Sequence, residues 1–91
     1  MCTYVVEKTA IEGSARGAEG WFQVKEANVS YDHPFHHPVE HALNIDFTNE
    51  ADGPAARVGV ELTAASARLL VTAILEALER GEAAERGAVA G

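Results

Sequence analysis

Up to Leu62, short parts of the chain alternate hydrophobic and polar residues, the pattern of strands that bury one face in a sheet. The alternation is cleanest from His41 to Phe47, where Leu43 and Ile45 fall between polar residues of the opposite face. Shorter stretches rich in β-branched and aromatic residues follow the same tendency, and Gly, Asn and Pro gather between them. The expected strands are Thr3–Ile11, Trp21–Tyr31, His41–Phe47 and Arg57–Leu62.

Two irregularities interrupt this pattern. Residues 12–20 contain three glycines and predict a turn or a flexible loop. In the second strand, Trp21 and Tyr31 share one face of the sheet. Polar Gln23 and Lys25 fall on that same face, and a β-bulge or an exposed end of the sheet would account for them.

Helical spacing replaces alternation after the last strand. Thr63 is the expected N-cap, because its hydroxyl can accept a hydrogen bond from a free amide of the first turn. Arg80 suits the last turn, and Gly81 can adopt the left-handed conformation that ends helices. The sequence therefore predicts a helix over Ala64–Arg80, followed by an Ala/Gly/Glu-rich flexible tail at 82–91. One broad apolar stripe runs along this helix: Ala67, Leu70, Val71, Ile74, Leu75 and Leu78.

Together these elements indicate an α+β fold. Short connections between the strands favour hairpins and hence antiparallel pairing. We expect a four-stranded antiparallel sheet with one C-terminal helix packed on one face, because a sheet must bury its apolar side against another element. Residues 1–81 then form a single α+β domain, and residues 82–91 are its tail. A chain of 91 residues can build one modest core.

The charge balance excludes several classes of partner. Seven Lys and Arg against fourteen Asp and Glu give a net charge of −7, which argues against nucleic acid and against an anionic membrane surface. No apolar run reaches the length of a membrane span, and the first residues lack the layout of a signal peptide. A single cysteine cannot form an internal disulfide, so we expect a cytoplasmic protein.

All four histidines lie between His33 and His41, at the expected junction of the second and third strands. His33 and His37 each precede a proline, which disfavours a helix through them. His33 instead ends one strand and His41 opens the next, with matching parity. In a hairpin their rings are expected on one face and near each other. His37, or with less support His36, would fold back from the loop as a third nitrogen ligand.

Three imidazoles with an open coordination position suit a borderline divalent metal such as Zn, Ni, Cu or Fe. The two acidic residues that flank the cluster, Asp32 and Glu40, are candidates for a fourth ligand, for orienting an imidazole, or for moving a proton in catalysis. The simpler alternatives are a solvated His/Pro loop and a core histidine at position 41. The expected metal ligands are His33, His37 and His41, with His36 in reserve.

Three further side chains are secondary candidates. Cys2, in the register of Tyr4, would face the histidines and offer a thiolate, although a lone cysteine in a strand is more often a small buried hydrophobe. Tyr4 and Tyr31 would offer hydroxyls to a pocket, although core packing is the commoner role of tyrosine.

Four short motifs occur together in this chain. They are Met1-Cys2-Thr3-Tyr4, Asp32-His33-Pro34, Pro38-x-Glu40-His41 and Leu43-Asn44-Ile45-Asp46-Phe47. Together they resemble a family of short, uncharacterised actinobacterial proteins that has no assigned activity. The resemblance covers most of the chain up to the helix end. It carries over no functional residue, and it strengthens only the expectation that the histidine segment is functional.

Two classes of function follow from these observations. The first is a small metal-dependent enzyme, in which the metal polarises a small metabolite or activates a bound water while Glu40 or Asp32 moves the proton. The second is a non-catalytic module that binds a ligand or a protein and whose histidines are incidental or sense pH. Metal analysis of untagged protein distinguishes the two classes.

A homodimer is also expected, because one helix covers only one face of the sheet. The face turned toward the helix would hold Trp21, Leu43, Ile45, Phe47, Val58 and Val60. Apolar residues would then remain on the other face, and such a patch marks an association surface. Sheet twist or the loop at Glu12–Gly20 would hide the patch in the alternative arrangement. The residues expected on it are Val5, Ile11, Phe22 and Val24.

Overall fold

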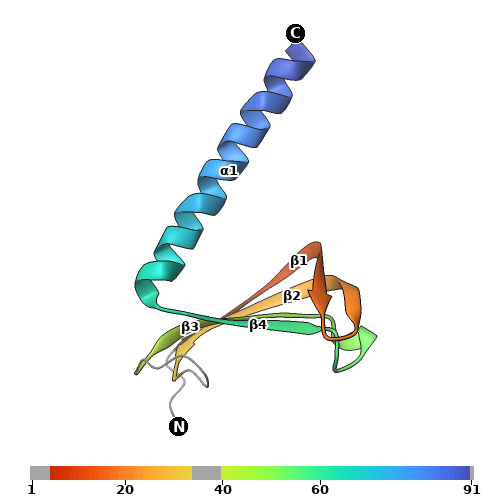
Figure 1. The fold of residues 1–91 in the computed structure, drawn as a ribbon, viewed down its shortest axis with the longest axis vertical. Helices are drawn as coiled ribbons and strands as arrows, with labels where there is room; N and C mark the ends of the chain where they lie inside the picture. The colour runs from red at the N-terminus through yellow and green to blue at the C-terminus, as the bar shows by residue number, and fades with distance from the viewer. Residues whose placement is uncertain (1–4, 34–39, 91) are drawn as a thin grey trace.

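The computed structural model describes residues 5–33 and 40–90. Four strands come first and one long helix follows them (Figure 1). A short 3₁₀ helix, η1 (Glu50–Asp52), lies between the third and fourth strands. The expected α+β fold, with an antiparallel sheet and a C-terminal helix, is confirmed. The main elements are β1 (Val5–Gly17), β2 (Gly20–Asp32), β3 (Ala42–Thr48), β4 (Arg57–Leu62) and α1 (Ala64–Ala90).

The strands lie in the order β1-β2-β3-β4, and every neighbouring pair is antiparallel. The register sorts apolar from polar residues by face. Val29 pairs with Ile45, which in turn pairs with Val60, so three β-branched residues lie side by side on one face. On the other face Asn28 pairs with Asp46. The alternation in the sequence of β3 thus corresponds to the two faces of the sheet.

The β1–β2 hairpin is longer than the sequence predicts. Residues 12–20 are not a loop, because only the turn at 18–19 lies outside the two strands. A Cβ atom on Gly17 would lie 3.0 Å from the Ala55 carbonyl oxygen, so glycine permits a close approach there. Gly20 has a φ of 112°, which residues with a side chain rarely adopt. Gly17 therefore allows a close contact with the Ala55 backbone, and Gly20 allows the tight turn of the hairpin.

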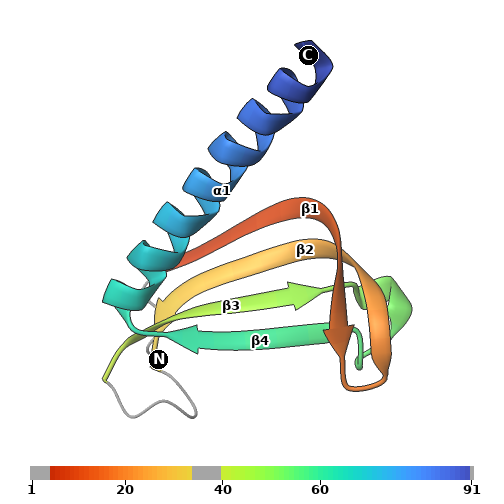
Figure 2. The same ribbon diagram turned by 45° about the horizontal axis from the view of Figure 1, so that its top comes forward.

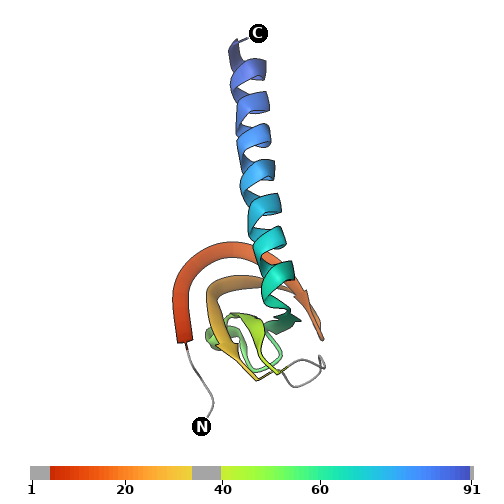
Figure 3. The ribbon, with the colours of Figure 1, turned by 90° about the vertical axis from the view of Figure 1, so that its left-hand side faces the viewer.

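A β-bulge bends this long hairpin. The register of β1 on β2 shifts between Ala10 and Gly13, whose partners on β2 are Glu26 and Val24. A bulge increases the twist and turns the strand, and both strands curve strongly (Figures 2 and 3). Lys25, one of the polar residues that interrupt the alternation of the second strand, lies at this level of the sheet. The bulge is on β1, opposite the irregular part of β2, where Gln23 and Lys25 are both exposed.

The buried cluster forms under the curved hairpin. It consists of Phe22 (8% exposed), Val24 (4%) and Ala56 (6%), whereas Trp21 is 71% exposed. The expectation that Trp21 faces inward and its neighbour outward is wrong. Val24 and Ala27 are both buried although they are three positions apart, so the inward face of β2 changes at the bend. Four further side chains pack against the cluster: Ile11, Ala15, Phe47 and Val58.

Helix α1 begins as expected and ends later. The Ser66 amide donates a hydrogen bond to the Thr63 hydroxyl at 3.1 Å, which confirms Thr63 as the N-cap. The expected end at Arg80 is wrong, because the helix continues through Gly81 to Ala90. A glycine costs about 1 kcal/mol relative to alanine in a helix interior, too little to end a helix rich in Ala, Glu and Arg.

Helix α1 does not pack across the sheet. It leaves the end of β4 and extends away from the strands, so that the molecule measures 55 × 32 × 19 Å (Figure 1). Of its described side chains, Ala67 alone is partly buried. The expected packing on one face is not found, because the curved hairpin covers the core instead. In the described part of the chain, no helix is long and apolar enough to cross a membrane.

Candidate functional site

His33 and His41 lie opposite each other at the mouth of the β2–β3 hairpin. The last ladder pair at this end is Asp32 with Ala42, so one further step of the register sets the two histidines across from each other. Directly opposed residues in an antiparallel pair have Cβ atoms about 4.5–5.5 Å apart. The matching parity in the sequence thus predicted a real proximity.

The rings of this pair are stacked. The His33 and His41 ring centroids are 5.0 Å apart, with an interplanar angle of 24°. Tyr31 stacks on the His41 ring at 5.8 Å and 23°. Tyr31 is therefore in contact with the histidine pair through its ring. The three rings continue the apolar face of the sheet to its end, where they remain accessible because Tyr31 and His33 are exposed.

A hydrogen bond fixes the His33 ring. Its Nδ1 lies 2.7 Å from the main-chain oxygen of Glu40. A carbonyl oxygen can only accept, so Nδ1 carries the proton and donates it. In the neutral ring the lone pair is then on Nε2. Histidine ligands of metals are commonly held in this way, with one ring nitrogen bonded to a carbonyl or carboxylate and the other left for the metal.

The two acidic residues lie at the two ends of the histidine segment. The Asp32 carboxylate accepts a hydrogen bond from the His33 amide at 2.7 Å, so it shapes the backbone where β2 ends. Glu40 is exposed, and its main-chain oxygen holds the His33 ring. Both residues adjoin the pair, and their proposed catalytic roles stay predictions.

Four predicted site residues lie outside the described residues: Cys2, Tyr4, His36 and His37. The structure therefore brings together His33, His41 and Tyr31 from the predicted set, with Asp32 and Glu40 beside them. Within residues 5–33 and 40–90, no cluster of three or more His, Cys, Asp or Glu side chains is arranged to hold a metal ion. The expected third ligand, His37, lies outside those ranges.

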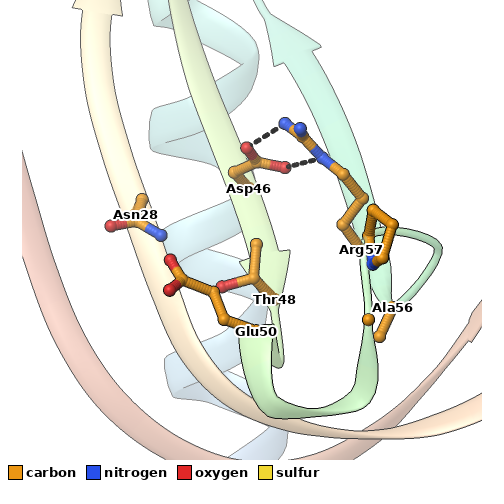
Figure 4. Close-up of a pocket in the computed structure, with 8 residues that line it drawn as sticks. Asn28, Asp46, Thr48, Glu50, Ala56 and Arg57 are labelled. Atoms are coloured by element: carbon orange, nitrogen blue, oxygen red, sulfur yellow. Dashed lines mark hydrogen bonds and ion pairs between the residues drawn. The ribbon is translucent and has the colours of Figure 1, made fainter.

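Sequence reasoning did not single out a cavity of about 430 Å³ on the polar face of the sheet (Figure 4). Asp46 and Arg57 form an ion pair at its edge, with Arg57 Nε 3.3 Å from Asp46 Oδ1. The polar alternate residues of β3 were the signal that could have found it. Thr48, at the far end of β3 from His41, lies about 23 Å along the strand from His41. The cavity is thus separate from them, and it is lined by Asn28, Asp46, Thr48, Glu50, Gly53, Pro54, Ala56 and Arg57.

Comparison with known families gives one match. Residues 1–88 match a Family of unknown function (DUF6295). The chain belongs to this family. The match spans the sheet, the histidine segment and nearly all of α1. Neither the curated proteins nor the solved structures contain a match to the chain. Membership of DUF6295 thus confirms an uncharacterised family and assigns no activity to the histidine pair.

Proposed function

We propose that the chain binds one divalent transition metal, Zn, Ni, Cu or Fe, at the mouth of the β2–β3 hairpin. His33 and His41 would be the anchoring ligands, and His37, with His36 in reserve, the third. The single observation that carries this proposal is the opposed pair of imidazoles, one of which has its Nδ1 proton bonded to the Glu40 carbonyl. We further propose a cytoplasmic location, for which the single cysteine is the support.

Binding would replace the ring stack with a convergent arrangement. Two nitrogens that share a tetrahedral metal at about 2.0–2.1 Å are roughly 3.3 Å apart. The centroid separation of 5.0 Å is close enough for rotation about side-chain bonds to bring the nitrogens together. The His33 ring needs the smaller change, because its Nε2 is already free of the proton. Tyr31 would lose its stacking partner as His41 turns.

Three histidines leave a coordination position open, and an open position is what separates catalytic from structural zinc sites. The metal would polarise a small metabolite or a bound water there. Asp32 and Glu40 are the groups that would move the proton, because Asp32 adjoins His33 and Glu40 adjoins His41 in the chain. We expect a small substrate, because the proposed site is formed by a short loop at the end of β2 and β3.

A non-catalytic interaction module is the second candidate, and a different observation favours it. Helix α1 extends from the sheet with its large apolar side chains exposed, which is typical of a surface that binds another protein. Under this function the histidines are incidental.

Metal titration of the untagged chain tests the first proposal. With Zn²⁺, Ni²⁺ or Cu²⁺ we expect about one ion bound per chain and a rise in unfolding free energy of about 2.7 kcal/mol at a hundredfold excess over Kd. His33→Ala and His41→Ala should each lower the affinity by more than about 10–100-fold, the loss already caused by removing a group that only orients a ligand. His36→Ala is the matched control and should change it least.

A chain that binds none of these ions, and whose stability does not change on their addition, contradicts the metal proposal. If binding persists and only His36→Ala and His37→Ala weaken it, the ions bind elsewhere in the segment, and the role assigned to His33 and His41 is wrong.

A further inference from the structure

Helix α1 exposes a continuous apolar stripe. Every side chain from residue 68 to residue 87 is exposed, including all the large aliphatic ones. Four of these fall within about 100° of the helix circumference, at i, i+1, i+4 and i+8 spacing. We call them the α1 stripe, and they expose between 42% and 56% of their surface: Leu70, Val71, Ile74 and Leu78.

A helix of this kind is stabilised mainly by packing of its apolar face, because isolated helices are marginal in water. In the described part of the chain, the sheet does not cover the α1 stripe, because the curved β1–β2 hairpin covers the buried cluster and α1 extends away from it. Singly scattered apolar residues on a surface are normal, but a contiguous row of them marks an interface.

We propose that a second copy of this chain covers the α1 stripe, in an antiparallel pair of α1 helices centred on Ile74. The large residues of the stripe are distributed evenly about this position. In an antiparallel pair, Leu70 of one chain then lies beside Leu78 of the other at both ends of the contact. The pair has two-fold symmetry, the commonest arrangement of a homodimer.

Charge favours a second copy in this orientation. The helix has three Arg and four Glu, so it carries only −1 of the chain's net −7, and the remaining −6 belongs to the rest of the chain. A parallel pair would set the two acidic sheets side by side. An antiparallel pair separates them by about 30 Å along the helix axis, well beyond a screening length of about 8 Å.

The charged residues that flank the stripe agree with this register. Arg68 and Glu82 lie on the same side of the stripe, near its two ends. With the two-fold axis at Ile74, Arg68 of one chain lies beside Glu82 of the other, twice in each dimer. In a parallel pair these two side chains would be about 21 Å apart.

The composition of the contact is also appropriate. The apolar stripe would be the dry centre of the contact, and Arg and Glu its polar rim, which is the usual anatomy of an interface. None of these residues takes part in the proposed metal site, so the two proposals fail independently.

Sedimentation of the full chain at micromolar concentration tests the dimer. We expect twice the mass of one chain for the natural protein. Ile74→Glu should weaken association at least a hundredfold. Leu69→Glu is the matched control, because Leu69 is 71% exposed but lies about 140° round the helix from Ile74. A monomeric natural protein, or equal loss of association in both variants, overturns the proposal. A cooperative denaturant unfolding transition shows that each variant still folds.

Charge exchange tests the orientation. Arg68→Glu and Glu82→Arg should each weaken the dimer by about two- to tenfold, because each places like charges together twice. The double variant should recover the affinity of the natural protein. If the double variant is as weak as the two single losses combined, the helices are not antiparallel in this register.

Discussion

The imidazole of His33 donates a hydrogen bond from Nδ1 to the main-chain oxygen of Glu40, across a distance of 2.7 Å. The two residues come from opposite ends of the loop between β2 and β3. The bond therefore ties the end of one strand to the start of the next, and it does so through a ring that faces His41. Backbone geometry at the hairpin mouth thus sets which nitrogen of His33 is available to a ligand.

This bond separates two roles for Glu40. Because the atom that holds the ring belongs to the main chain, Glu40→Gln should leave the Zn²⁺ affinity unchanged. A tenfold or larger fall would instead show that the carboxylate takes part in the site, as a ligand of the metal or as a group that orients an imidazole. Asp32→Asn tests the other flanking carboxylate in the same way, since an amide oxygen can still accept from the His33 amide. Competition titration against a chelator of known affinity measures both variants.

The adjacent aromatic residues of β2 should respond oppositely to truncation. Phe22→Ala should lower the free energy of unfolding by about 3 kcal/mol, because the ring is in the centre of the buried cluster. Trp21→Ala should change it by about 0.5 kcal/mol or less, since Trp21 is 71% exposed. Denaturant unfolding followed by circular dichroism gives both values. The reverse order would mean that Trp21 is the buried residue, as the alternation suggests.

Gly17 and Gly13 provide a second matched pair on β1. A Cβ on Gly17 would lie 3.0 Å from the Ala55 carbonyl oxygen and 3.1 Å from the Phe22 ring, so Gly17→Ala should destabilise the fold by about 1–3 kcal/mol. Nothing lies within 4 Å of the corresponding atom on Gly13. Gly13→Ala should therefore leave the free energy of unfolding unchanged or raise it by up to about 1 kcal/mol, because alanine lowers the conformational entropy of the unfolded chain.

Equal effects in the two glycine variants would contradict the close approach of the hairpin tip to the turn between β3 and β4. Thermal unfolding of both variants in the same buffer measures this difference, because each variant adds one alanine to the same strand.

Local patterns along the sequence determined the element types. The alternation of β3, the cap at Thr63 and the apolar spacing of α1 each depend on residues a few positions apart, and the structure confirms each of them. The proximity of His33 and His41 was also predictable. It requires only that two strands joined by a short loop pair in register, which fixes the residues at the hairpin mouth.

Tertiary structure decided which faces are buried. The parity of β2 in the sequence sends Trp21 inward, but a bulge on the neighbouring strand bends β2 and turns Phe22 and Val24 inward instead. No pattern within β2 contains that information, because the extra residue is on β1. The same bend brings the hairpin over the core, where the helix was expected. Helix α1, whose sequence shows only that one side is apolar, is thereby left with its stripe uncovered, since what a helix packs against depends on the space that the other elements leave.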